Sequence, residues 1–69
     1  MALQIYQNRI QRIFNRPLDK KRQADALYDS VLGWLMCEWL LNKLDSVDYF
    51  YLRDEIAREE YQKAIKNLI

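Results

Sequence analysis

Hydrophobic residues recur at helical spacing in three successive segments of this chain, and the densest run lies in the middle. In the first segment, about residues 2–15, they return every three or four positions and fall on one stripe: Leu3, Tyr6, Ile10, Ile13 and Phe14. A stripe about 100° wide with polar residues around it predicts an amphipathic helix with one buried face. Pro17 ends this helix, because the residue before a proline is displaced from helical backbone angles.

The second segment, about residues 18–44, begins as an ordinary amphipathic helix with the stripe Ala24, Leu27, Tyr28 and Val31. It then becomes apolar on nearly every side, since the only charged residue between Val31 and Leu41 is Glu38. A helix that is apolar all round is buried all round. We therefore expect two of its faces to pack within the chain and the third to meet loops or another molecule. Gly33 lies inside this run, where it is either a tolerated weakness or a point at which another helix comes close.

The third segment, about residues 47–68, follows a capping signal and contains no helix breaker. Asp45 or Ser46 is the expected N-cap; if Asp45 caps, Asp48 stands at the third helical position. One apolar stripe runs along the whole helix and a second covers only its first half; they comprise Phe50, Ala57, Tyr61, Ala64 and Leu68, and Tyr49, Leu52 and Ile56, respectively. An i,i+4 ion pair is expected between Glu59 and Lys63.

These segments predict one all-α domain of three helices spanning residues 1–69. Because the link between the second and third segments is very short, we expect a long antiparallel helical hairpin, 18–44 and 47–68, with the shorter helix 2–15 packed on it. The second half of the second segment and the first half of the third segment are each apolar on two sides, and they meet at the same end of this hairpin. A chain of 69 residues buries only about 60% of its unfolded surface. We therefore predict a homodimer with its seam at that end.

The composition excludes the other usual ways to stabilise so short a chain. There is one cysteine, Cys37, and no histidine, so neither an internal disulfide nor a Cys/His zinc site can form. We expect Cys37 to be a small buried hydrophobe. The start lacks the pattern of a signal peptide, and the longest apolar run is shorter than the roughly 18 residues of a membrane span. We therefore expect a soluble, cytoplasmic protein that does not contact the membrane.

Side chains in catalytic arrangements are also missing, so we predict a protein that is not an enzyme and uses no cofactor or metal. Histidine, the commonest general base, is absent, no glycine-rich phosphate loop is present, and the carboxylates of the third segment should form a solvated face. Glu38 is the outstanding polar residue of the apolar run. It either reaches the edge of its helix and pairs with a cation of this chain, or it meets a cation of a partner and fixes the register.

The favoured function is a protein-interaction module. Tryptophan, tyrosine and arginine dominate binding hot spots, and the expected interface residues are Trp34, Glu38, Trp39, Tyr49, Phe50 and Tyr51. For the tryptophans, a place in the core is the alternative. At least one of the three consecutive aromatic residues should face solvent or a partner, because they point in three directions. Small, glycine-poor helical domains are common among phage and mobile-element proteins, and this likeness of size alone favours a regulator or inhibitor that binds a host protein.

An uneven charge distribution supports a second hypothesis. The net charge is +1, but residues 1–23 carry six basic and one acidic residue, whereas residues 24–69 carry five basic and nine acidic ones. A nucleic-acid-binding regulator would use the basic region: Arg9, Arg12, Arg16, Lys20, Lys21 and Arg22. No DNA-binding motif is visible, however, and a solvated basic face, or one neutralised by the acidic third helix, is the commoner outcome. A purely structural homo-oligomerisation subunit is the third alternative.

Overall fold

The computed structural model describes residues 3–68 and shows three helical segments packed together. The first is α1 (Leu3–Phe14) and the second is α2 (Lys21–Leu40). The third consists of α3 (Ser46–Glu55), a π-helical turn η1 (Ile56–Glu60) and α4 (Tyr61–Lys66), which follow one another without a break. The described residues form no named strand, so the prediction of an all-helical fold is confirmed.

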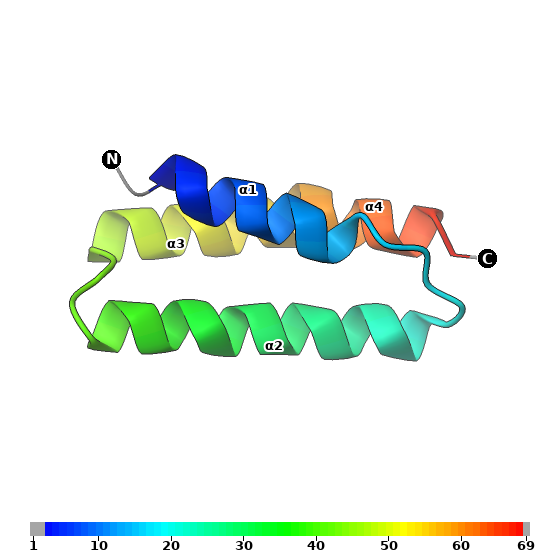
Figure 1. Cartoon of the computed structure of the whole chain (residues 1–69), viewed down its shortest axis with the longest axis horizontal. Helices are drawn as coiled ribbons and strands as arrows, with labels where there is room; N and C mark the ends of the chain where they lie inside the picture. The colour runs from blue at the N-terminus through cyan, green and yellow to red at the C-terminus, as the bar shows by residue number, and fades with distance from the viewer. Residues whose placement is uncertain (1–2, 69) are drawn as a thin grey trace.

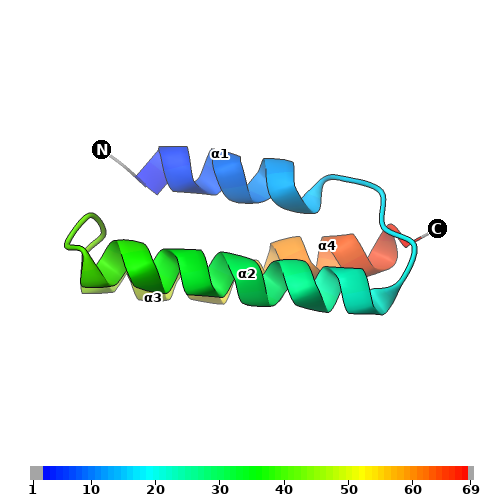
Figure 2. The same cartoon turned by 60° about the horizontal axis from the view of Figure 1, so that its bottom comes forward.

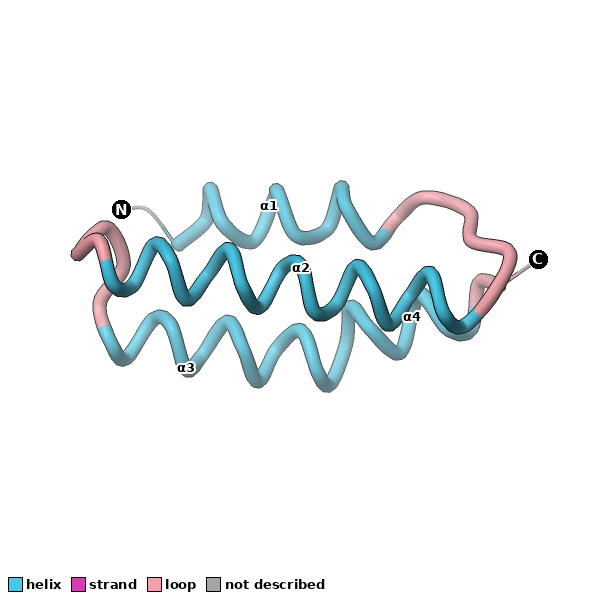
Figure 3. The backbone as a smooth tube through the Cα atoms, turned by 90° about the horizontal axis from the view of Figure 1, so that it is seen from below, coloured by secondary structure: helices cyan, strands magenta, loops and turns pink. Residues whose placement is uncertain are grey.

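The three segments lie along one another and give an elongated molecule of 37 × 18 × 16 Å. In Figure 1, α2 runs in the direction opposite to α1 and to the α3–α4 segment. The tube view shows α2 with α1 on one side and α3 on the other (Figure 3). The view in Figure 2 places α1 along the other two segments over much of their length, and contacts join α1 to α2, α3, η1 and α4.

The helix boundaries follow local signals, and two of them differ from the expected ones. Helix α2 begins at Lys21 rather than near Leu18, because Leu18 is buried in extended backbone and forms an isolated bridge with Leu68. It ends at Leu40 rather than near residue 44, since Asn42 takes a left-handed conformation with φ of 62°. The expected cap of α3 is confirmed, because the Asp45 carboxylate accepts the backbone N–H of Asp48 at 2.9 Å.

The core is a seam of apolar residues contributed by all three segments. The predicted stripe of α1 faces this core: Tyr6, Ile10 and Phe14 are buried, and Leu3 and Ile13 are partly buried. From α2 come Ala24, Val31 and Leu35. The largest fully buried side chains are Phe14, Leu35, Leu52 and Ile56, so each segment supplies at least one of them.

The longer of the two stripes expected in the third segment does not face the core in its first half. The π-helical turn explains which residues face inward. Phe50 and Ala57 are exposed, whereas the shorter stripe of Tyr49, Leu52 and Ile56 forms the core. In η1 the N–H of Tyr61 bonds to the carbonyl of Ile56, five residues back. This wider turn takes up one extra residue. The inward-facing positions therefore continue from 56 through 60 to 64.

The same turn carries a buried carboxylate. Glu60 is only 4% exposed and pairs with Lys63 at 3.5 Å. The expected partner of Lys63 was Glu59, which is exposed instead. The ion pair thus spans three residues rather than four.

Candidate functional site

Large hydrophobic side chains that remain exposed gather at one end of the bundle. Within residues 3–68 there are seven of them, each between 47% and 78% exposed: Ile5, Met36, Leu40, Leu41, Val47, Phe50 and Tyr51. They come from the start of α1, the last part of α2 and the start of α3. These three stretches lie together at the end of the molecule that is on the left in Figure 1. We call these seven residues the apolar end.

Most members of the apolar end lie on the outer sides of their helices. Met36 and Leu40 are one turn apart on α2, and at 100° per residue they point away from Val31 and Leu35, which are buried. Val47, Phe50 and Tyr51 share the outer side of α3 in the same way, since they are three and four residues apart. The apolar run of α2 is therefore covered on two faces and open on the third.

Three aromatic rings pack together at the junction between α2 and α3, and one of them, Phe50, also belongs to the apolar end. The Trp39 ring stacks on Tyr49 with centroids 4.5 Å apart, and Phe50 meets their edges at 5.7 and 5.0 Å. The Trp39 indole also donates to the Ser46 hydroxyl at 3.1 Å. Tyr49 is buried, so this expected interface residue serves packing within the chain. Phe50 and Tyr51 are exposed, which confirms that at least one of the three consecutive aromatic residues faces outward.

The other two expected interface residues, Trp34 and Glu38, face α1 and are partly buried. The Trp34 ring lies 5.2 Å from that of Tyr6, and the Arg9 guanidinium lies over it at 4.6 Å. Glu38 accepts the Tyr6 hydroxyl at 3.4 Å and forms no ion pair within the described part of the chain. Burial, and then the charge of Glu38, raise the pKa of the Tyr6 hydroxyl. Both residues therefore help to hold α1 against α2.

The expectation for Cys37 was wrong, and the structure favours one of the two alternatives for Gly33. Cys37 is exposed rather than buried, because it lies on the outer side of the helix, one turn beyond Gly33. A Cβ placed on Gly33 would meet no atom of the described chain within 4 Å, so no other helix of this chain comes close to it. Within the single chain, the glycine is a tolerated weakness.

The six residues of the predicted basic region are all exposed: Arg9, Arg12, Arg16, Lys20, Lys21 and Arg22. Within residues 3–68 the only ion pair that any of them makes joins Lys21 to Asp25 at 3.5 Å. The acidic third segment therefore does not neutralise this region by direct pairing. The third segment is hydrogen-bonded to α1 through Gln7, whose amide donates to the Glu55 carboxylate at 3.4 Å.

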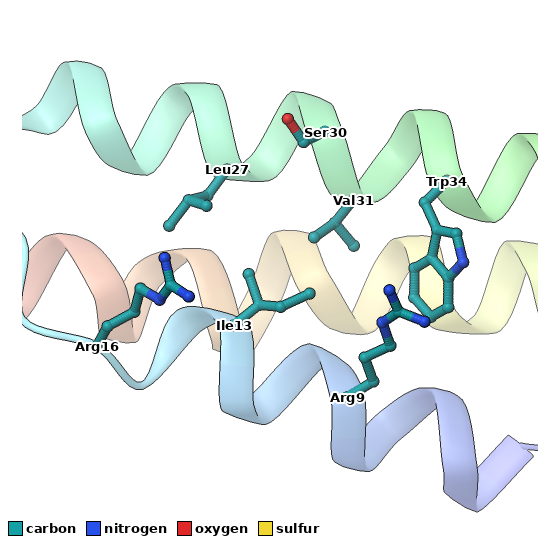
Figure 4. Close-up of a pocket in the computed structure, with 7 residues that line it drawn as sticks. All are labelled: Arg9, Ile13, Arg16, Leu27, Ser30, Val31 and Trp34. Carbon is teal, nitrogen blue, oxygen red and sulfur yellow. The ribbon is translucent and has the colours of Figure 1, made fainter.

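A groove runs between α1 and α2, bordered by two of these arginines. It consists of two adjoining depressions of about 290 and 280 Å³ that share Arg16, Leu27 and Ser30. Figure 4 shows Arg9 reaching from α1, and Arg16 from the loop that follows it, over the space between the two helices. The remaining lining residues of the groove are Ile13, Leu18, Gln23, Ala26, Val31 and Trp34.

The carboxylates of the described residues do not gather into a metal-binding cluster. Residues 3–68 hold no cluster of three or more Cys, Asp or Glu side chains able to bind a metal ion. Asp25 has the most distinct environment. Its carboxylate accepts a hydrogen bond from Tyr61, which is the main cause that lowers its pKa, and Lys21 lowers it further. The same hydrogen bond raises the pKa of the Tyr61 hydroxyl.

None of the helices in the described part of the chain combines the length and the hydropathy needed to span a bilayer. No family model, no curated protein and no solved structure matches this chain. The apolar end and the groove are therefore interpreted from their own geometry.

Proposed function

We propose that the protein is a small non-enzymatic protein-interaction module that acts in the cytoplasm as a regulator or inhibitor, and that the apolar end is its main binding surface. The observation that carries this proposal is the gathering of seven exposed large hydrophobic residues at one end of the bundle. Scattered exposed hydrophobic residues are normal on a monomer, whereas seven large ones at one end of so small a bundle favour an interaction surface there.

The occupant that we propose for the apolar end is a second copy of the chain. Seven large side chains that are about half to three-quarters exposed present on the order of 800 Å² together, given roughly 150–250 Å² for one large aromatic side chain. A standard interface takes about 800 Å² from each partner, so the side chains of the apolar end together expose an area of the order that a homodimer needs.

Light scattering of the purified chain over a range of concentrations tests this proposal. We expect the mass to rise from one to two subunits, and Leu40→Glu and Phe50→Glu to hold the chain monomeric, since each places a charge within the contact. Gln62→Glu is the matched control, because it adds the same charge at an exposed position of α4, far from the apolar end (Figure 1). A wild type that stays monomeric, or two variants that dimerise as well as the control, would refute the proposal.

Nucleic-acid binding remains a second candidate function, favoured by one observation. Arg9 and Arg12 on α1, and Arg16 two residues beyond its end, are exposed and form no ion pair within residues 3–68. Free cations at this spacing can neutralise phosphates and would make binding depend on salt. If DNA or RNA retards the protein at low salt, and high salt or alanine at these three positions abolishes the effect, this function is supported. If nothing is retarded at low salt, it is refuted.

A further inference from the structure

The groove between α1 and α2 is a second surface, distinct from the apolar end, and its two sides differ in chemistry. Its floor is apolar, built from Ile13, Leu27, Val31 and part of Trp34. One side carries the guanidinium groups of Arg9 and Arg16. The α2 side carries only the short side chains of Ala26 and Ser30. We propose that this groove binds an acidic amphipathic helix of a partner protein.

Two arginines at the border of the groove are placed to meet carboxylates. Arg9 lies on α1, and Arg16 lies two residues beyond the end of that helix, in the bend before Pro17. Arg9, whose guanidinium lies over the Trp34 ring, and Arg16 make no ion pair within residues 3–68, so both can pair with Glu or Asp of a helix in the groove. Arg12 lines a separate depression with Asn8, Gln11 and Asn15.

The opposite side of the groove leaves room for the backbone of such a helix. Ala26 and Ser30 have short side chains and are exposed, so they do not fill the space above Leu27. Packed helices lie about 8–10 Å apart, depending on the side chains between them. Apolar residues of the bound helix at i, i+3 or i+4 and i+7 then reach the floor, as in other helix-in-groove complexes.

An acidic helix fits the groove better than a nucleic acid does. Proteins that bind single strands stack bases on exposed aromatic rings, but the Trp34 ring is covered by Arg9 on one side and contacts Tyr6. A sugar-phosphate backbone would also leave the apolar floor in contact with water. An amphipathic helix covers the floor and pairs with the arginines at the same time.

The test uses two synthetic helical peptides of about five turns, roughly 18 residues. Both carry the same apolar stripe, flanked by Glu in one and by Lys in the other; a short single strand and a duplex of DNA are the further probes. We expect the Glu peptide to bind at least about tenfold more tightly than the Lys peptide, equivalent to roughly 1.4 kcal/mol. In NMR spectra, the indole N–H signal of Trp34 should move on binding, while that of Trp39, which is bonded to Ser46, stays.

Two chain variants and one control locate the binding. The double variant Arg9→Glu, Arg16→Glu should weaken the Glu peptide about tenfold or more. The double control Arg53→Glu, Arg58→Glu makes the same change of charge at two exposed positions of the third segment and should not weaken binding. Because the double variant also removes the Arg9–Trp34 contact, Ser30→Trp is a second test that fills the groove without changing charge. Equal binding of both peptides, unchanged binding by Ser30→Trp, or arginine-dependent binding of DNA in place of the peptide would overturn the proposal.

The two proposals can fail separately. Leu40→Glu and Phe50→Glu remove the contact proposed at the apolar end but leave the groove intact, so they should bind the Glu peptide like the wild type. If these variants lose self-association and keep peptide binding, both surfaces are supported. If they lose peptide binding while keeping their helix content, the groove is not an independent site and the inference is wrong.

Discussion

Replacing leucine by alanine at one buried and one exposed position compares how much core packing and the apolar end each contribute to the free energy of unfolding. Leu52 is 0% exposed in the middle of α3, whereas Leu40 is 71% exposed at the end of α2. The side chain removed is the same in both cases. Any difference in the free energy of unfolding therefore reports the surroundings of the two residues.

The expected difference is large relative to the stability of so short a chain. Removing a fully buried leucine costs about 2–5 kcal/mol, because burial is lost and a cavity remains. A chain of 69 residues is stable by about 3–10 kcal/mol at the usual value per residue. We therefore expect Leu52→Ala to lose much of the stability, while Leu40→Ala changes it by about 0.5 kcal/mol or less.

Urea unfolding followed by circular dichroism measures both variants. Low protein concentration is needed, because any dimer that uses Leu40 adds to the apparent stability at high concentration. Equal slopes with urea would show that the unfolded states are comparable. If Leu52→Ala loses less than about 1 kcal/mol, or if Leu40→Ala loses as much as Leu52→Ala, the placement of these helices in the bundle is wrong.

Three further substitutions test local features. Asp45→Ala should cost about 1 kcal/mol by removing the cap of α3, whereas Asp54→Ala, on the solvated side of that helix, should cost little; equal losses would contradict the cap. Gly33→Ala should stabilise the chain by about 0.5–1 kcal/mol in urea unfolding, since the new Cβ meets nothing; a loss of stability would show an unseen contact. The pKa of Asp25 is lowered in the folded chain, so its stabilising contribution is present above the ordinary value near pH 4 and disappears as the pH falls through the lowered value. Asp25→Asn should therefore be less stable than the wild type at neutral pH, by a margin that shrinks in acid, and a margin independent of pH would contradict this.

Periodicity and local signals predicted α1 and the start of α3 well. The stripe of α1 has a single interpretation, because all apolar residues of this helix except Ile5 fall on one side and Pro17 follows. Asp45 caps α3 through a contact only three residues long, which depends on no other part of the chain. Features of this kind are fixed by neighbouring residues, so the sequence alone is enough to locate them.

The register of the third segment and the identity of the exposed residues were harder to predict. Two stripes competed in α3, and the π-helical turn that decided between them packs against α1, a contact between segments that are distant in the sequence. For α2, helical periodicity gave the angles between residues but not which side meets a neighbour. An excess of apolar surface was therefore predictable, whereas its composition was not: Ile5, Met36, Leu40, Leu41 and Val47 were all missed as members of it.

The π-helical turn also bears on how this chain can change in length. In a regular helix, deleting one residue rotates everything downstream by about 100° and removes side chains from the core. Between Ile56 and Glu60 the helix already accommodates a surplus residue. Deletion of the exposed Arg58 should convert the turn to regular α-helix and leave Tyr61 beside Asp25, with the aromatic circular dichroism of the wild type. Loss of that signal would show instead that the surplus residue is required, and that shortening is no more tolerated here than elsewhere in the helix.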